Sequence, residues 1–309
     1  MAAGSLGIAD EVHQALAEGR PVVALESSIV AQGFPSPQNL AVGREMAAAV
    51  RAEGAVPAQV AVIDGAVRVG LDDGELVRLA NEDSLKCSAR DLGPVLASGA
   101  LGATTVAATA RIAAMAGVRV FATGGIGGVH PGTGPADVSA DLMEIARAPV
   151  AVVCSGAKSI LDLAATLETL ETVGVPVLGY GVDEFPAFHT GESGLGLEHR
   201  VDDAAAAARL LAAHWSLEGA GGLVLCNPPP SELALPAAEL DRLLAAAATE
   251  AAAEGVRGGA LTPFLLRRLN ELSEGRTLAV NHALAVANAG LAASIAAAYA
   301  VLEGASRQP

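Results

Sequence analysis

Aromatic residues are scarce in this chain, which has one tryptophan, two tyrosines and five phenylalanines among 309 residues. Hydrophobic residues nevertheless make up 52% of the sequence, so a core must be filled mainly by alanine, valine, leucine and isoleucine. The three cysteines, Cys87, Cys154 and Cys226, are odd in number and lack the spacing of a metal site. We therefore expect free thiols that act as small hydrophobic side chains in a reducing cytoplasm.

Positive charge is also in short supply, since 19 lysines and arginines face 34 acidic residues and the net charge is −15. Binding a nucleic-acid polymer through its phosphates needs clustered cations, so this class of partner is excluded, whereas one small phosphorylated ligand is not. The N-terminus has no basic segment of the kind that opens a signal peptide. The segment 281–302 has no charged residue, but it is mostly alanine and contains Asn288. We expect a buried or interfacial helix there and no membrane partner.

Short apolar segments recur along the chain and alternate with segments of helical periodicity, which is typical of an α/β domain with a mostly parallel sheet. The segments predicted as strands are 21–28, 60–63, 67–69, 118–122, 149–154, 176–180 and 222–226. Asp64 and Gly65 join two of them in a hairpin, so the sheet is mixed. No linker or repeat interrupts the pattern. We expect a single domain over 1–309, an α/β/α sandwich, with short disordered tails at about 1–6 and 304–309.

Lysine is rarer still, since Lys86 and Lys158 are the only two in the sequence. Arginine serves as a surface cation but stays charged, so it cannot replace an amine that must lose its proton. Lys158 lies where the predicted strand 149–154 gives way to a helical segment at 160–172, and open α/β folds bind ligands at this edge of the sheet. A helix N-terminus and apolar walls there favour the neutral amine, a nucleophile for carbonyl carbon. A solvated lysine at a helix start is the alternative.

Other polar side chains occupy similar positions. Glu26 ends the first predicted strand, and His130 lies in the glycine-rich run 123–134 that follows the strand 118–122. Glycines let the backbone approach a ligand and point amides at an anion, although this run is neither a dinucleotide fingerprint nor a P-loop. Each residue has an ordinary alternative, because Glu26 could cap a helix or pair with a cation and His130 could be a solvated loop residue.

Two aspartates and an asparagine complete the set of candidates. Asp137 and Asp141 are one helical turn apart, and Asn281 opens the last apolar helix. Asp141 could simply be a charge partner of its own helix N-terminus, and Asn281 could cap its own helix. Because several candidates share one kind of position, at the carboxyl end of a strand, we expect them to form an active site at that edge of the sheet.

Several motifs carry a family resemblance. They are ALESSIVAQGFP from Ala24, KCSARDL from Lys86, GATTVAAT from Gly102, FATGGIGGVH from Phe121, DVSADL from Asp137, CSGAKSILD from Cys154, TPFLL from Thr262, and Asn281. In this order, and over roughly residues 8–302, the sequence resembles the pseudouridine-5'-phosphate glycosidase family, which includes the indigoidine synthase A-like proteins.

The resemblance implies an enzyme, classed with the carbon–oxygen lyases, that cleaves the carbon–carbon glycosidic bond of pseudouridine 5'-phosphate to uracil and ribose 5-phosphate. Lys158 would form an imine with C1' of the ring-opened sugar, Glu26 would exchange protons with the base and the sugar, and Asp137 would hold one Mn²⁺, or another divalent ion such as Mg²⁺. The other substrate contacts that the resemblance implies are Lys86, Val106, Ser139, Ala140 and Asp141, with Thr105, Thr123 and His130 at the phosphate and Asn281 at the uracil. The family also implies a homotrimer.

The chemistry agrees with these roles. A carbon–carbon glycosidic bond has no leaving oxygen to protonate, so the paired carboxylates of ordinary glycosidases do not suffice, and an iminium supplies the missing electron sink. An acid with a raised pKa must then protonate the uracil carbon. One visible carboxylate suits a hydrated Mn²⁺ or Mg²⁺ better than zinc. The alternatives are a class I aldolase-like lyase acting on another sugar phosphate, and a non-catalytic nucleotide-binding protein.

Overall fold

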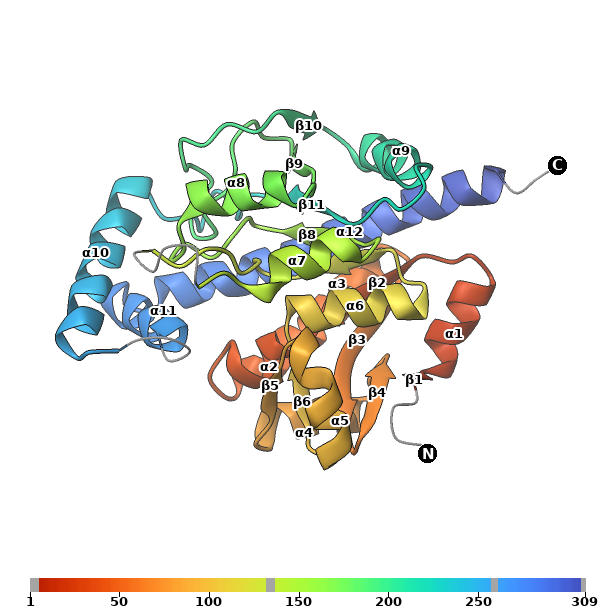
Figure 1. Ribbon diagram of the computed structural model, residues 1–309, viewed down its shortest axis with the longest axis horizontal. Helices are drawn as coiled ribbons and strands as arrows, with labels where there is room; N and C mark the ends of the chain where they lie inside the picture. The colour runs from red at the N-terminus through yellow and green to blue at the C-terminus, as the bar shows by residue number, and fades with distance from the viewer. Residues whose placement is uncertain (1–5, 132–136, 257–260, 307–309) are drawn as a thin grey trace.

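One sheet runs through the part of the chain that the computed structural model describes, residues 6–131, 137–256 and 261–306 (Figure 1). Its strands are β1 (Leu6–Ile8), β2 (Val22–Glu26), β3 (Val56–Ile63), β4 (Ala66–Val69), β5 (Leu85–Cys87), β6 (Gly102–Thr104), β7 (Val120–Ala122), β8 (Ala151–Cys154), β9 (Val177–Tyr180), β10 (His199–Val201) and β11 (Leu223–Cys226). The main order is β1-β4-β3-β2-β7-β8-β11-β9-β10, and β5 and β6 attach at β3. All pairings are parallel except those of β3 with β4 and β6, so the predicted mixed, mostly parallel sheet is confirmed.

Helices cover both faces of this sheet. They are α1 (Asp10–Ala17), α2 (Ser28–Gln32), α3 (Gln38–Ala52), α4 (Asp73–Asn81), the short 3₁₀ turn η1 (Ala89–Asp91), α5 (Leu92–Ser98), α6 (Val106–Ala116), α7 (Ala140–Arg147), α8 (Leu163–Thr172), α9 (Ala204–Trp215), α10 (Ala237–Ala253), α11 (Leu261–Leu272) and α12 (Arg276–Ser306). In β2, Val22 and Ala24 pack in one hydrophobic cluster with α1, α6 and α7. Val23 and Leu25 point the other way, into a second cluster with α3, α9 and α12. This alternation gives the predicted α/β/α sandwich.

The charge-free segment forms most of α12, which extends along the long axis of the molecule (Figure 1). By length and composition this helix could cross a membrane. In the structure it packs between the sheet, at β2, β7 and β8, and the helices α3 and α9. Buried alanines such as Ala285 and Ala289 let it approach the strands closely. The prediction of a buried helix is therefore confirmed.

The structure also departs from the sequence-based expectations. The three-residue strands β1, β5, β6 and β10 were not predicted, because so few residues give no periodic signal. Leu6 already belongs to β1, and α12 continues to Ser306, so both elements reach into the predicted tails, whose remaining residues lie outside the described ones. The helix after Lys158 starts at Leu163 and not at Ile160, which leaves the lysine in a loop.

Candidate active site

Four neighbouring parallel strands, β2, β7, β8 and β11, end at the same edge of the sheet, where α/β folds bind their ligands. Glu26 is the last residue of β2, and Thr123 follows β7. The loop that contains Lys158 follows β8. The predicted acid and the predicted nucleophile therefore come from two strands that are separated only by β7.

Glu26 is buried, with 7% of its surface exposed. The hydroxyl of Thr123 donates to its Oε1 and the hydroxyl of Ser28 donates to its Oε2. Burial raises the pKa of Glu26, and the positive charge of Lys158 and the two hydroxyl donors oppose that rise only in part. The carboxyl group thus keeps its proton to a higher pH than an ordinary glutamic acid, which suits a general acid.

Lys158 is half-buried in the loop between β8 and α8. Its backbone N–H donates to Ile126 O at 3.1 Å, and Gly156 before it has φ = 76°. A Cβ on Gly156 would lie 2.0 Å from Pro186 O, so only glycine fits this turn. Asp162 caps α8 with its side chain, accepting from Ala165 N at 3.0 Å. The sequence predicted a helix N-terminus directly beside Lys158. In the structure α8 begins only after Asp162, so its N-terminus lies further along the chain.

Two more charged residues lie near this pair. Lys86 on β5 lies close enough to Lys158, Asp141 and Glu26 for their charges to act on its amine. Desolvation lowers the pKa of Lys86 and the charge of Lys158 lowers it further, against the attraction of the two carboxylates, although the side chain also reaches solvent. None of the ion pairs among the described residues involves either lysine. The structure thus brings Glu26, Lys86, Asp141 and Lys158 into one charged site, in which neither lysine amine is held in an ion pair by a described residue.

Asp141 is held by the backbone on both sides. Its Oδ1 accepts from Ala107 N at 2.9 Å and its Oδ2 from Gly127 N at 2.8 Å, which joins the start of α6 to the glycine-rich loop. A Cβ on Gly127 would lie 2.7 Å from Asp141 Oδ2, so the close approach needs glycine here. Ser139 accepts from Asp141 N at 3.2 Å and caps α7, and Ala140 is the exposed first residue of that helix. The aspartate is therefore bound to another helix, and it is also the acidic residue in the first turn of its own helix, α7.

The start of α6 is the best candidate for an anion site. Thr105 is its N-cap residue, and the Thr105 hydroxyl is buried without a hydrogen-bond partner among the described residues. Val106 is the first helical residue, and β6, which precedes it, pairs with β5, which carries Lys86. An unpaired hydroxyl at a helix N-terminus beside a cation can donate to a phosphate. Thr123, the other threonine predicted at the phosphate, donates its one hydroxyl proton to Glu26. The structure therefore favours a role for Thr123 in holding the acid over the predicted phosphate contact.

The remaining predicted residues surround the glycine-rich loop. His130 N donates to Asp137 O at 3.0 Å, so the two half-buried residues face each other across a short antiparallel bridge. Asn281 lies inside α12, which begins at Arg276, so the alternative that it caps its own helix is wrong. Its Oδ1 lies 3.2 Å from the place of a Cβ on Gly124, and it therefore contacts the first turn of the loop.

A metal at Asp137 would have one protein carboxylate. In the parts of the chain that the structure describes, no three His, Cys, Asp or Glu side chains gather as a metal site. Both oxygens of Asp141 accept from backbone amides. The half-buried Asp137 carboxylate fits a hard, hydrated cation such as Mn²⁺, whose other ligands would be water or substrate oxygens.

A family model described as indigoidine synthase A like protein matches residues 11–298 of the chain. The chain belongs to the indigoidine synthase A-like family. It is 50% identical over 298 residues to a protein of Myxococcus xanthus named pseudouridine-5'-phosphate glycosidase. The aligned residues cover 96% of this chain and 98% of the relative. A Solibacter usitatus protein of the same name is 53% identical over 293 residues, 94% of this chain and 98% of the relative. The family resemblance inferred from the sequence is confirmed.

A solved structure supports the fold of this family member. The prealnumycin C-glycosynthase AlnA, in a crystal structure with ribulose 5-phosphate, superposes with a TM-score of 0.90 at 40% identity and covers 97% of this chain and 98% of its own. The predicted single-domain fold, a mostly parallel sheet flanked by helices, is thus that of the family.

Sequence reasoning missed several residues that support the site of this family member. Ser28, in the motif that begins at Ala24, donates to Glu26, a role that its place in the sequence does not indicate. Ser159, next to Lys158, hydrogen-bonds the buried His189 at 2.8 Å between Oγ and Nδ1. Asn288 hydrogen-bonds the residues that follow β7 and β8. Its signal in the sequence is a polar side chain within an apolar helix.

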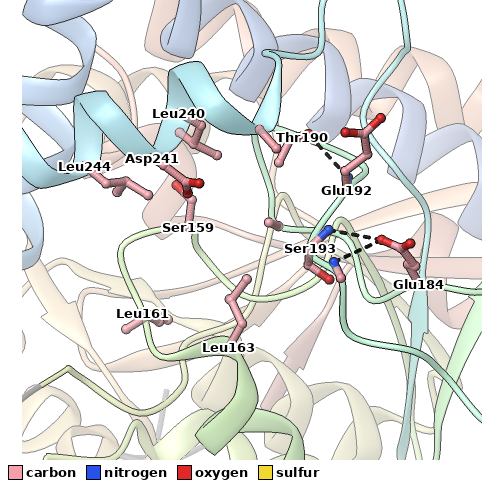
Figure 2. Close-up of a pocket in the computed structure, with 13 residues that line it drawn as sticks. Ser159, Leu161, Leu163, Glu184, Thr190, Glu192, Ser193, Leu240, Asp241 and Leu244 are labelled. Carbon is pink, nitrogen blue, oxygen red and sulfur yellow. Dashed lines mark hydrogen bonds between the residues drawn. The ribbon is translucent and has the colours of Figure 1, made fainter.

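A cavity of about 560 Å³ borders the Lys158 loop at Ser159 and Leu161 (Figure 2). Ser159, Leu161, the 184–194 loop and α10 line it, and none of the predicted site residues does. In Figure 2 Glu184 points to the loop backbone, where it accepts from Ser193 N at 3.2 Å. Ser159, which lines this cavity, is the residue that hydrogen-bonds His189.

Burial lowers the pKa of His189 to about 3, so the folded protein keeps this imidazole neutral while the unfolded chain protonates it near pH 6.5. Because the unfolded state binds more protons between these values, stability is lost as pH falls below 6.5. We expect His189 to cost about 2 kcal/mol at pH 5 relative to pH 7.5, or roughly 4 °C in Tm. His189→Asn, which stays neutral, is expected to remove this part of the pH dependence in thermal melts. An unchanged slope between pH 5 and 7.5 would contradict the buried neutral histidine.

Proposed function

We propose that this protein cleaves pseudouridine 5'-phosphate to uracil and ribose 5-phosphate through a covalent imine on Lys158. The observation that carries the proposal is the meeting of a buried acid, Glu26, with an open lysine amine at one edge of the sheet. The relatives that are about half identical over nearly their whole length are named for this substrate, which supports the same choice here.

The residues divide the reaction between them. The deprotonated amine of Lys158 bonds to C1' as the C1'–O4' bond breaks, which opens the sugar ring, and the proton that the nitrogen then loses passes to O4'. Glu26 gives its proton to C5 of the uracil. The nitrogen lone pair then forms the C1'=N iminium, while the electrons of the C1'–C5 bond restore the C5=C6 double bond of uracil. Water hydrolyses the imine, which releases ribose 5-phosphate and regenerates the amine. Glu26 recovers a proton in the hydrolysis half of the cycle, as general base.

The surrounding residues bind and orient. The Thr105 hydroxyl, the amide of Val106 and the charge of Lys86 would hold the phosphate, because all three favour an anion at the start of α6. Asn281 would contact the uracil from α12, and His130 with Ser139 would close the other side. A Mn²⁺ on Asp137 would supply positive charge to a substrate oxygen. The homotrimer and the cytoplasmic location expected from the sequence stay predictions.

Uracil release is the direct test of this function. With pseudouridine 5'-phosphate and Mn²⁺, we expect stoichiometric uracil and ribose 5-phosphate, and a chelator should lower the rate at least about 10-fold until Mn²⁺ is added back. Asp137→Ala should not be restored by the metal. Turnover of other sugar phosphates without uracil would favour the aldolase-like alternative, and tight binding without turnover would favour a nucleotide-binding protein. Indifference to the chelator would remove Asp137 from the metal role.

The similarity to a C-glycosynthase adds the reverse direction. If the same amine forms the imine from free ribose 5-phosphate, the enzyme should also join this sugar to uracil and give pseudouridine 5'-phosphate, since both directions share one transition state. The position of that equilibrium is a property of the reactants, not of the protein.

A further inference from the structure

Asn288 is a fully buried polar residue in the middle of α12. Its Nδ2 donates to Thr123 O at 2.9 Å and to Ser155 Oγ at 3.1 Å, and lies 3.3 Å from Gly124 O. Its Oδ1 accepts from Asn227 Nδ2 at 3.0 Å. One side chain is therefore satisfied at both ends and joins the residues that follow β7, β8 and β11.

Two of these partners lead directly to the reacting groups. Thr123 donates its hydroxyl to Glu26, so the backbone carbonyl that Asn288 holds belongs to the residue that fixes the acid. Ser155 begins the loop that carries Lys158, and its own N–H donates to Gly124 O at 2.9 Å. The acid and the nucleophile are thus linked through Asn288 by a chain of buried hydrogen bonds.

A purely structural need does not explain this residue well. Between Val280 and Ala296, a segment that the structure describes throughout, the other buried residues of α12 are apolar. Burying an amide there is favourable only because all its hydrogen bonds are made, and an apolar side chain would pack this helix without that requirement. The carbonyls and the hydroxyl that Asn288 binds lie at the edge of the sheet where the site is. The buried amide can therefore serve the site.

We infer that Asn288 is a positioning residue that sets the distance between Glu26 and Lys158 by holding Thr123 and Ser155 to one side chain. The inference rests on the proposed function, in which these two groups act on one substrate. Catalysis depends on such spacing, because a displacement of about 1 Å can cost about 100-fold in rate. Asn288 itself does not touch the substrate in this account.

Asn39 offers a matched control. It is also a buried asparagine in a helix, with 4% of its surface exposed, and it donates to Ala80 O at 2.8 Å and accepts from Leu40 N at 2.9 Å. These partners lie in α3 and α4, away from the strand ends that carry the site. Asn39→Ala should therefore lower the melting temperature about as much as Asn288→Ala does, without changing the site.

The experiment measures kcat and KM for uracil release, and the rate of borohydride trapping with ribose 5-phosphate, well below each variant's melting temperature. For Asn288→Ala we expect kcat and the trapping rate to fall at least about 10-fold while KM changes less than about 3-fold. Ser155→Ala, a small change that should fold, is expected to lose about 3-fold or more in both rates. Asn39→Ala should match the wild type in all three.

Several outcomes would overturn the inference. Asn288→Ala with the rates of Asn39→Ala would make its role structural only, and so would a rise in KM at unchanged kcat. If Asn288→Ala does not fold, Ser155→Ala decides, and wild-type rates in that variant would count against the link. Absence of uracil release in the wild type would instead contradict the proposed function, and the trapping rates would still compare the variants.

Discussion

Replacing Lys158 with alanine is expected to abolish uracil release, with a loss on the order of 10⁴-fold or more in kcat, because no other group can take over the covalent step. Lys158→Arg should be as inactive as the alanine variant. Guanidinium keeps the positive charge but cannot lose its proton to attack a carbon, so charge and nucleophilicity are separated by this one change. Steady-state assays at saturating pseudouridine 5'-phosphate check both variants.

Lys86 is the matched control for this experiment, since it is the other lysine of the chain and lies in the same charged site. Its proposed task is to attract the phosphate, which arginine can also do. Lys86→Arg should therefore retain much of kcat and change mainly KM. If Lys158→Arg kept more than about a tenth of the wild-type rate, or if Lys86→Arg were the inactive variant, the nucleophile would have been assigned wrongly.

Glu26→Gln is expected to lower kcat about 10² to 10⁴-fold, the usual contribution of a general acid, while the binding of substrate changes little. Glutamine has nearly the same shape, and the hydroxyls of Thr123 and Ser28 can rotate to suit its amide. The loss would therefore report the missing proton and not a disturbed fold. A variant that kept more than about a tenth of kcat would contradict the role of Glu26.

The same substitution should stabilise the protein at neutral pH. Burial raises the pKa of Glu26 above its ordinary value of 4.5, so the folded state holds this proton more tightly than the unfolded chain. The stability that follows is fully present below pH 4.5 and is lost as pH rises through the folded value. Glu26→Gln avoids that loss, and its Tm at pH 8 should exceed that of the wild type, with the gain vanishing near pH 4. A lower Tm at pH 8 for the variant would contradict the raised pKa of Glu26.

The sequence predicted the arrangement of long elements and the edge of the sheet at which the site forms. Strands such as β2 and β8 are short apolar runs, and the residues after them must meet at one edge if the strands are parallel. The order of these parallel strands is enough to place Glu26 and Lys158 at one edge. The family motifs then gave them roles that spacing could not give, since a carboxylate at a strand end has several ordinary uses.

What could not be predicted depends on contacts between distant segments. The bond of Asn288 to Thr123 O joins residues 165 positions apart, and nothing in the local pattern of α12 marks its partners. The loop around Lys158 was expected to be a helix start, because Ile160 and Leu161 fit a helical period, but Asp162 caps α8 after them. Asp141, which the family resemblance places at the substrate, also joins α6 to the glycine-rich loop through its two oxygens, and this link could not be predicted from the sequence.

The central claim is that the amine of Lys158 becomes bonded to the sugar. Borohydride reduction in the presence of ribose 5-phosphate, followed by peptide mass spectrometry, tests it most directly, because Lys86, Lys158 and the N-terminus are the only amines to distinguish. We predict one reduced sugar phosphate per chain, on the peptide that contains Lys158, and none in Lys158→Arg. An adduct on Lys86, or an unmodified chain under conditions in which uracil is released, would contradict the account.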